Sequence, residues 1–187
     1  MGAYMQSTAT RALGLGIIAM VMYMIFSFGT IRKYIAPVIL ACVVILSTMI
    51  SVSIPAGAYG LWMGINPTVQ IDTVFIIAIL TIIGYGINDV IIIFDRVREN
   101  MIRYGDKKEV HLATIFEESI WQSMKRSLGT SLSTLLVLLG MFVFATGVVS
   151  TFAFTVGVGV IASTLSSIFI AVPTAYLLVK VTTKGRK

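Results

Sequence analysis

Charged side chains are scarce in this sequence. Its 187 residues include 14 Lys and Arg and only 8 Asp and Glu, which together make up 12% of the chain, whereas 57% of the residues are hydrophobic. The mean hydropathy of +0.97 is too high for a soluble domain folded around a single core. We therefore predict an integral membrane protein.

Residue types that support common enzyme chemistry are also scarce. Cys42 is the only cysteine, so no disulfide can form within the chain. His111 is the only histidine and falls in a predicted loop, which argues against a histidine metal cluster and a Ser-His-Asp triad. The absence of a GxxxxGK[ST] loop excludes ATP hydrolysis by a P-loop mechanism. We expect that the chain is not an enzyme and that it needs no cofactor or metal. Any energy that it uses should then come from a partner or from an ion gradient.

Five apolar stretches are long enough to cross a bilayer, which takes about 20 residues of helix. They cover approximately residues 12–28, 35–54, 73–94, 128–144 and 151–179. The strands of membrane β-barrels are shorter and alternate in polarity, so these stretches are expected to be helices. The last could tilt or break near Pro173. The sequence predicts an all-α, polytopic membrane protein with a single transmembrane domain over residues 1–187.

Basic residues fall almost entirely on one side of these spans. Of the 14, only Arg11 lies on the opposite side, which leaves 13 in the segments that follow the first, third and fifth spans. Because short cytoplasmic loops hold Lys and Arg in excess, we expect a cytoplasmic C-terminus and an N-terminus on the other side of the cytoplasmic membrane. This bias accounts for the net charge of +6, so no nucleic-acid partner is needed to explain it.

The long segment between the third and fourth spans has a mixed second half. Residues 110–124 combine apolar Leu112, Ile115 and Phe116 with acidic Glu117 and Glu118. Such a mixture is typical of an amphipathic helix, so we expect a helix lying on the cytoplasmic membrane surface before the fourth span begins.

The third span contains a carboxylate. Asp89 is six residues before Asp95, which places it about 9 Å inside the cytoplasmic boundary of a helix. Thr81, Tyr85 and Asn88 lie near the same helical face. Acids within a span are costly and often carry ions or protons, so Asp89 is a candidate proton carrier, with Tyr85 and Asn88 beside it. The alternatives are a structural carboxylate bonded to neighbouring helices and, for Asn88, simple interhelical bonding.

The fourth span begins with a second polar stripe. Arg126, Thr130, Ser133 and Thr134 lie close to one helical face, with Ser127 and Ser131 beside it. Arg126 and Thr130 could face the polar stripe of the third span and join the proton pathway. The alternative is that Arg126 only anchors the end of the span at the membrane surface.

The fifth span has small residues at four-residue intervals, namely Thr155, Gly159, Ser163 and Ser167. Small side chains on one face let helix backbones approach closely, so Gly159, Ser163 and Ser167 are predicted to be helix-packing positions.

Three segments of the sequence resemble motifs of one family, the SecF protein-export membrane proteins. GYGINDVIIIFDRVREN (84–100) resembles the motif G-Y-S-[IL]-N-D-[ST]-I-V-V-F-D-R-I-R-E-N. SMKRSLGTSLSTLL (123–136) resembles S-x-x-R-T-x-x-T-S-x-T-T-L-L, and STLSSIFIAVP (163–173) resembles G-T-x-S-S-I-F-I-A-x-P. The three segments occur in the order that the family has, and the resemblance covers essentially the whole chain.

The resemblance implies a function. SecF pairs with SecD in the resistance-nodulation-division superfamily, and the pair uses the proton motive force to assist the Sec translocon in moving preproteins across the membrane. The chain would then be half of a resistance-nodulation-division-type bundle with SecD, the translocon, preprotein, membrane lipid and protons as its partners. By the same resemblance, Asp89 is similar to the motif aspartate of proton conduction and Arg126 to the functional arginine at the start of the next span.

The sequence also departs from the family. Family members begin with one more span and a periplasmic domain, so we expect this chain to correspond to the five C-terminal spans of SecF. The serine of G-Y-S is replaced by Gly86, and the second span carries aliphatic residues where the family has a His-Asp pair. Two other functions therefore stay open: a structural subunit that binds SecD or the translocon without conducting protons, and one half of a small-molecule efflux permease.

Overall fold

The computed structural model of the chain describes residues 2–31, 35–66, 71–104 and 111–184, and these are almost entirely helical. The elements are α1 (Gly2–Ser27), η1 (Gly29–Ile31), α2 (Pro37–Ile65), α3 (Thr73–Tyr104), α4 (Leu112–Phe144), α5 (Val148–Ser166), η2 (Ser167–Ala171) and α6 (Val172–Lys184). Here η1 is a 3₁₀ turn and η2 is a π-helical turn. No strand occurs in these ranges, and the prediction of an all-α fold is confirmed.

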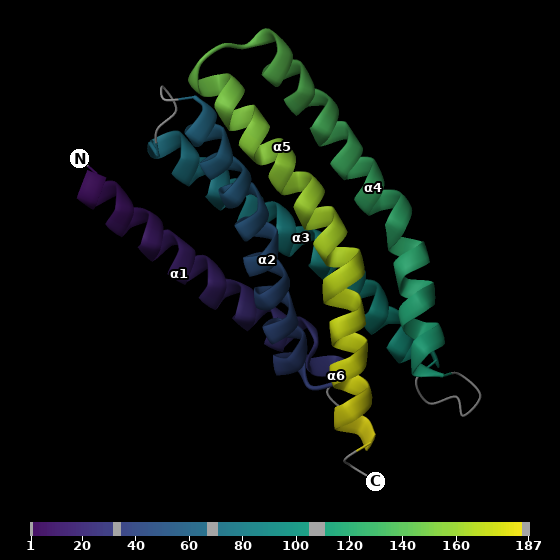
Figure 1. Cartoon of the computed structure of the whole chain (residues 1–187). Coiled ribbons are helices and arrows are strands. Elements are labelled where there is room, and N and C mark those ends of the chain that lie inside the picture. Colours follow the sequence, from purple (N-terminus) through teal and green to yellow (C-terminus); the bar gives the residue numbers. More distant parts are fainter. Residues whose placement is uncertain (1, 32–34, 67–70, 105–110, 185–187) are drawn as a thin grey trace.

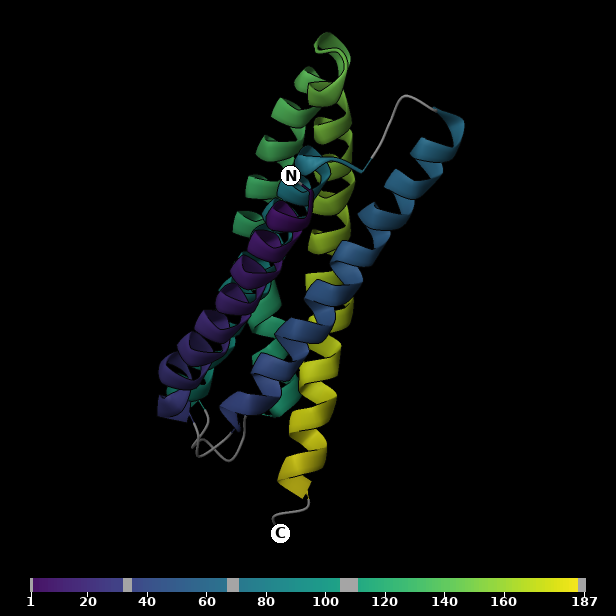
Figure 2. The same cartoon turned by 90° about the vertical axis from the view of Figure 1, so that its left-hand side faces the viewer.

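The long helices lie alongside one another in a bundle. α1 occupies one edge and α4 the opposite edge, with α2, α3 and α5 between them (Figure 1). Helices α1 to α5 run in alternating directions and α6 continues α5, so the two termini lie toward opposite ends of the bundle (Figures 1 and 2). We call the end at which α4 turns into α5 the Gly147 end, because Gly147 has a positive φ of 63° in that turn, a conformation that favours glycine. The other end is the C-terminal end.

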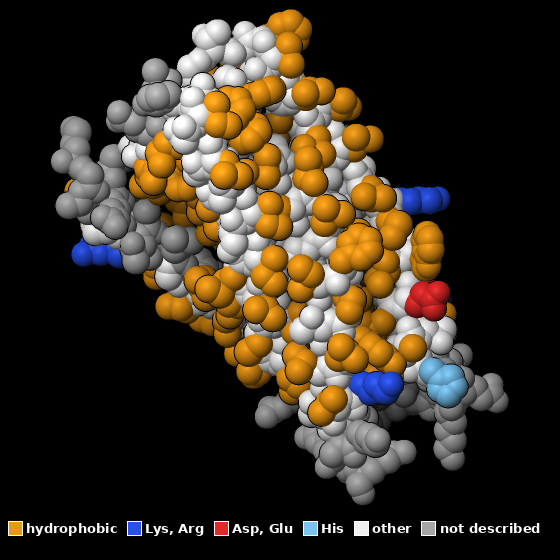
Figure 3. Space-filling view, viewed as in Figure 1, with side chains coloured by type: hydrophobic (Ala, Val, Ile, Leu, Met, Phe, Trp, Pro, Cys, Tyr) orange, Lys and Arg blue, Asp and Glu red, His pale blue; other side chains and the backbone are white. Residues whose placement is uncertain are grey.

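Four helices are long and apolar enough to cross a membrane. They are Pro37–Ile65, Thr73–Tyr104, Leu112–Phe144 and Val148–Thr182, the last of which runs through α5, η2 and α6, and they correspond to the last four predicted spans. The first predicted span corresponds to a shorter apolar helix, Gly14–Ser27, within α1. Apolar side chains cover much of the face seen in Figure 3, and charged ones lie at its edges. The chain is a multi-pass membrane protein.

The helices α1 to α4 all extend beyond their predicted spans; α1 begins at Gly2 and α3 ends at Tyr104. α2 continues from the expected end at residue 54 to Ile65, with Pro55 inside the helix. A proline is tolerated there because neighbouring helices in membrane bundles satisfy the backbone groups that it leaves without a hydrogen bond. The predicted surface helix over 110–124 is not a separate element, since α4 continues from Leu112 through the whole fourth span. No proline interrupts it, and Lys125 and Arg126 change its polarity without disfavouring helix.

The last span contains a π-helical turn. Ser167–Ala171 adopts this conformation between α5 and α6, and Pro173 follows it. Prolines and π-turns both bend helices, but here the helix continues beyond them to Lys184. A break near Pro173 is therefore not observed.

Two apolar clusters form the core, and a polar layer separates them. The cluster toward the C-terminal end includes Phe28, Phe94, Phe116 and Val179, and the cluster toward the Gly147 end includes Ala78, Leu138 and Val160. Between them along the helices lie buried polar residues, which are Asp89 of α3, Ser127 and Ser131 of α4, Ser163, Thr164 and Ser166 of α5, and Ser167 of η2. This layer is the candidate functional site.

Candidate functional site

Asp89 lies at the centre of the polar layer and is only 2% exposed. The Ser127 hydroxyl of α4 donates a hydrogen bond to Asp89 Oδ1, and the Ser167 hydroxyl of η2 donates to Asp89 Oδ2 at 3.0 Å. Each carboxylate oxygen therefore has its own hydroxyl donor. Asp89 joins three elements, namely α3, α4 and the π-turn.

A line of buried serines runs along α4. Ser119, Ser123, Ser127 and Ser131 occur at four-residue intervals, which places them on one helical face, and all four are buried. Ser119, Ser123 and Ser131 donate to the main-chain carbonyl four residues earlier, at 2.6 to 2.9 Å. Ser127 instead donates across the interface to Asp89. It is the one serine of this line that bonds to a carboxylate.

The Ser167 hydroxyl has two acceptors within reach. It lies 3.0 Å from Asp89 Oδ2 and 2.9 Å from the carbonyl oxygen of Thr164. A hydroxyl has only one proton to donate, so these two oxygens compete for it. Ser167 can therefore direct its proton to α3 or back to α5.

Further hydroxyl pairs connect the helices around Asp89. Tyr85 Oη donates to Ser131 Oγ at 3.0 Å, and Ser131 Oγ lies 2.7 Å from Thr164 Oγ1, which joins α3, α4 and α5. On the other side of α5, Ser166 Oγ lies 2.9 Å from Ser47 Oγ of α2. Every helix that contacts α5 in this layer is thus connected to it through hydroxyl groups.

The residues predicted for the proton pathway do not all lie together. Asp89 is buried and Tyr85 is half-buried next to Ser131, but Asn88 is exposed because a step of one residue turns it about 100° from Asp89. Arg126 is also exposed, and no ion pair or hydrogen bond involves its side chain within the described ranges. Thr130 bonds only to carbonyls of its own helix. The structure therefore surrounds Asp89 with serine hydroxyls, without placing Arg126 or Thr130 in contact with it.

The three predicted packing positions face α3 one after another. A Cβ on Gly159 would lie 2.4 Å from Ile82 Cγ1, so the two helices approach closely there. Ser163 lies opposite Gly86, and Ser167 reaches Asp89 as described above. The sequence reasoning assigned only packing to Ser167, and it overlooked the serines at 119, 123 and 127 as a series, although their four-residue spacing is visible in the sequence.

The hydroxyls around Asp89 allow its hydrogen bonds to change direction. An ionised carboxylate only accepts hydrogen bonds, whereas a carboxylic acid also donates one. The Asp89 carboxylate accepts hydrogen bonds from two hydroxyls, and each of these hydroxyls can act either as a donor or as an acceptor. Among the residues of the described ranges, no group of three His, Cys, Asp or Glu side chains is placed to hold a metal ion.

The comparisons with known proteins agree with this architecture. The model of the family "Protein export membrane protein SecD/SecF, C-terminal" matches residues 1–181. The chain belongs to this family. Its all-α fold and its buried Asp89 are therefore compared with those of SecD/SecF C-terminal domains.

Relatives of this SecD/SecF domain include longer translocase subunits. It is 48% identical over 109 residues to the protein translocase subunit SecF of Sebaldella termitidis, which covers 58% of this chain and 35% of that protein. It is 30% identical over 169 residues to SecF of Thermobaculum terrenum, covering 90% of this chain and 51% of that protein. The protein translocase subunit SecDF of Brucella abortus is 38% identical over 148 residues, 79% of this chain and 18% of that protein.

A solved structure shares the fold of this domain. The crystal structure of SecDF in its super-membrane-facing form matches with a TM-score of 0.81 and 29% identity, and the match covers 100% of this chain and 23% of that one. The chain therefore spans about half or less of the length of each of these relatives.

Proposed function

We propose that this chain is the membrane part of a SecF-type subunit that works with SecD in the proton-driven export of preproteins through the Sec translocon. The family assignment and the SecF and SecDF relatives support the setting. The observation that carries the proposal is Asp89, a buried acid whose two oxygens bind hydroxyls from two other elements. Its proposed location is the cytoplasmic membrane, with the basic C-terminal end facing the cytoplasm, as the distribution of Lys and Arg favours.

Protonation of Asp89 would change how these elements are joined. The ionised carboxylate accepts from both Ser127 and Ser167. When Asp89 takes up a proton, its new O–H donates to one of the two serines, and that serine then donates to a carbonyl of its own helix. Ser167 already lies 2.9 Å from the Thr164 carbonyl, so it needs only a hydroxyl rotation. Proton uptake would thus weaken the contact between α3 and the π-turn, and proton release would restore it.

Arg126 and Thr130 lie on the exposed side of α4. We propose that they act there, toward the partner subunit.

The Asp89→Asn variant tests the proposal. The amide has nearly the shape of the carboxylic acid but cannot release a proton, so we expect export stimulation by the SecD-containing complex to fall at least tenfold while the complex still assembles. Glu117→Gln is the matched control, because it removes an exposed acid on α4 and should leave export unchanged. Full export activity of Asp89→Asn would favour a structural subunit that conducts no protons.

The choice of ion needs a separate measurement. Export stimulation in membrane vesicles should persist in a sodium-free buffer and should collapse when a protonophore is added. A requirement for sodium would contradict proton coupling.

A further inference from the structure

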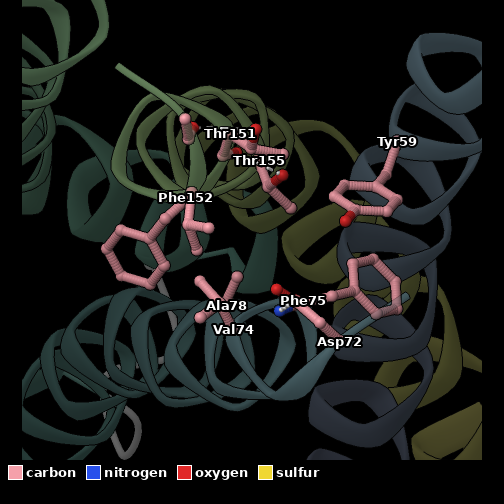
Figure 4. Close-up of a pocket in the computed structure, with 10 residues that line it drawn as sticks. Tyr59, Asp72, Val74, Phe75, Ala78, Thr151, Phe152 and Thr155 are labelled. Atoms are coloured by element: carbon pink, nitrogen blue, oxygen red, sulfur yellow. Dashed lines mark hydrogen bonds between the residues drawn. The ribbon is translucent and has the colours of Figure 1, made fainter. Parts of the chain in front are cut away.

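A cavity opens at the Gly147 end of the bundle. It has a volume of about 180 Å³ and lies between α2, α3 and α5. The residues that line it include Tyr59, Asp72, Phe75 and Thr155 (Figure 4). Asp72 is exposed, whereas Tyr59 and Thr155 are buried. The cavity therefore leads inward from the surface, with a carboxylate at its mouth.

The charge of Asp72 has no partner of opposite sign. Asp72 Oδ1 accepts from the Phe75 N–H at 3.0 Å, which caps the first turn of α3. A carboxylate has about four acceptor sites, so this bond leaves others. The sequence has no Lys or Arg over residues 34–95 and 127–179, and Asp72 forms no ion pair within the described part of the chain. The mouth of the cavity is thus negatively charged.

The threonine hydroxyls of the cavity can only accept from a ligand. Thr155 Oγ1 donates to the Thr151 carbonyl at 2.8 Å, and Thr151 Oγ1 donates to the Gly147 carbonyl at 3.2 Å. Each hydroxyl has one proton, which these bonds within α5 and its cap occupy. Their remaining lone pairs suit a ligand that donates hydrogen bonds.

Aromatic rings lie on two sides of the cavity. Figure 4 shows the Tyr59 and Phe75 rings on one side and the Phe152 ring on the other. The centroids of the Tyr59 and Phe75 rings are 4.3 Å apart. Aromatic faces attract cations, and a nearby carboxylate adds to this attraction. Because a primary ammonium also carries three N–H donors, it matches these rings, the carboxylate and the hydroxyls better than a quaternary ammonium, which has none.

α5 begins at the same cavity. Gly147 and Val148 contribute to its lining, and no side chain caps this end of α5. The first N–H groups of a helix have no partner within the helix, and they favour an anion. The cavity therefore offers a carboxylate for a cation and, beside it, N–H groups for an anion. This combination suits a zwitterion.

The membrane can supply this zwitterion. The cavity lies where the spans end, because α2 ends at Ile65 and α3 begins at Thr73, so it lies near the depth of the lipid headgroups. Beside it, the side chains of Ile77 and Val148 are exposed and apolar, which suits contact with acyl chains. An ethanolamine phospholipid carries both a primary ammonium and a phosphate.

We propose that this cavity binds the headgroup of an ethanolamine phospholipid. The ammonium lies against Asp72, Thr155 and the aromatic rings, and the phosphate lies at the start of α5. This site is separate from Asp89, so the inference does not rest on the proposed role of that residue in export.

Native mass spectrometry of the purified full chain in detergent tests the proposal. The dissociation constant of the first bound lipid is measured for phosphatidylethanolamine, phosphatidylcholine and phosphatidylglycerol with identical acyl chains. We expect phosphatidylethanolamine to bind at least tenfold more tightly than the other two. Equal binding of the ethanolamine and choline lipids would overturn the proposal, as would tighter binding of phosphatidylglycerol, which has no ammonium.

Asp72→Asn assigns the binding to the cavity. The Asn side chain can still accept from the Phe75 N–H, so α3 keeps its cap while the charge is lost. We expect the preference for phosphatidylethanolamine over phosphatidylcholine to disappear. Thr155→Val is a second variant, which removes a buried acceptor without changing the size of the side chain, and should weaken phosphatidylethanolamine binding severalfold.

Glu117→Gln is the matched control, because it removes an exposed acid of α4 far along the chain from this cavity. It should leave the ethanolamine preference unchanged. An undiminished preference in both Asp72→Asn and Thr155→Val would overturn the site.

Soluble phosphoethanolamine identifies the source of the ammonium. It carries the same headgroup without acyl chains, so at a concentration equal to that of the lipid we expect it not to displace phosphatidylethanolamine. Displacement at equal concentration would assign the cavity to a soluble amine and would overturn the lipid as its ligand.

Discussion

The Ser127 hydroxyl donates to the Asp89 carboxylate across the interface of α3 and α4. The serines on either side of it along α4, Ser123 and Ser131, donate to carbonyls of their own helix. Among the serines of this series, Ser127 is therefore the one that bonds to the buried carboxylate. Its contribution to stability can be separated from that of its neighbours.

Ser127→Ala should lower the free energy of unfolding by about 1–3 kcal/mol, because Asp89 loses one of its two donors in a buried site. Export stimulation should fall as well if Asp89 changes its partners during transport. Unfolding of the purified chain in detergent, followed by circular dichroism, measures the first effect.

Ser123→Ala is the control for this change. It removes a hydroxyl of equal size and burial whose bond stays within α4, so we expect a loss below about 1 kcal/mol. Equal losses for the two variants would mean that the bond to Asp89 adds nothing to stability.

Gly159→Ala should destabilise the bundle by about 1–3 kcal/mol, because the added Cβ meets the Ile82 side chain at 2.4 Å. Ile82 is branched at Cβ and cannot easily turn away. Ile82→Ala in the same chain removes the obstructing atoms, so Gly159→Ala should cost much less in that background. Thermal unfolding of the four proteins gives the coupling energy, and additive effects would show that the two residues are not in contact.

Hydropathy and charge predicted much of the architecture. The apolar stretches and the all-α fold followed from composition, because membrane helices must bury their own backbone groups. The ends of α2 and α4 could not be predicted in this way. Hydropathy reports where polarity changes, whereas Pro55 and Lys125 lie inside helices that continue through such changes.

The candidate site was predicted only in part. Asp89 was identifiable because an acid in a span is rare, but its partners depend on how the helices are rotated against each other. Arg126 was expected near Asp89 from its position in the chain, yet its side chain is exposed, and the donors come from Ser127 and Ser167. The π-turn that presents Ser167 has no simple sequence signal.

Replacing Asn100, which lies closer to the C-terminal end of the bundle, should also lower the free energy of unfolding. Its side-chain amide donates to Ser119 Oγ at 2.9 Å and to Gln122 Oε1 at 3.1 Å, and the residue is buried. Asn100→Asp replaces these donors with acceptors, so we expect a loss of about 2–3 kcal/mol at neutral pH. Gln122→Ala, which leaves the bond to Ser119 in place, should cost less than about 1 kcal/mol. An unchanged free energy of unfolding in the Asn100→Asp variant would contradict these hydrogen bonds between α3 and α4.

Arg126 should behave in the opposite way to Asn100. Because its side chain is exposed and has no ion pair in the described part of the chain, Arg126→Gln should change the free energy of unfolding by less than about 0.5 kcal/mol. If it acts toward the partner subunit as proposed, the same variant should nevertheless reduce export stimulation at least tenfold in the complex. Unfolding of the purified chain and export by the complex are therefore measured on one variant. A large loss of stability would place Arg126 in an intramolecular contact, and full export would leave it as a membrane anchor.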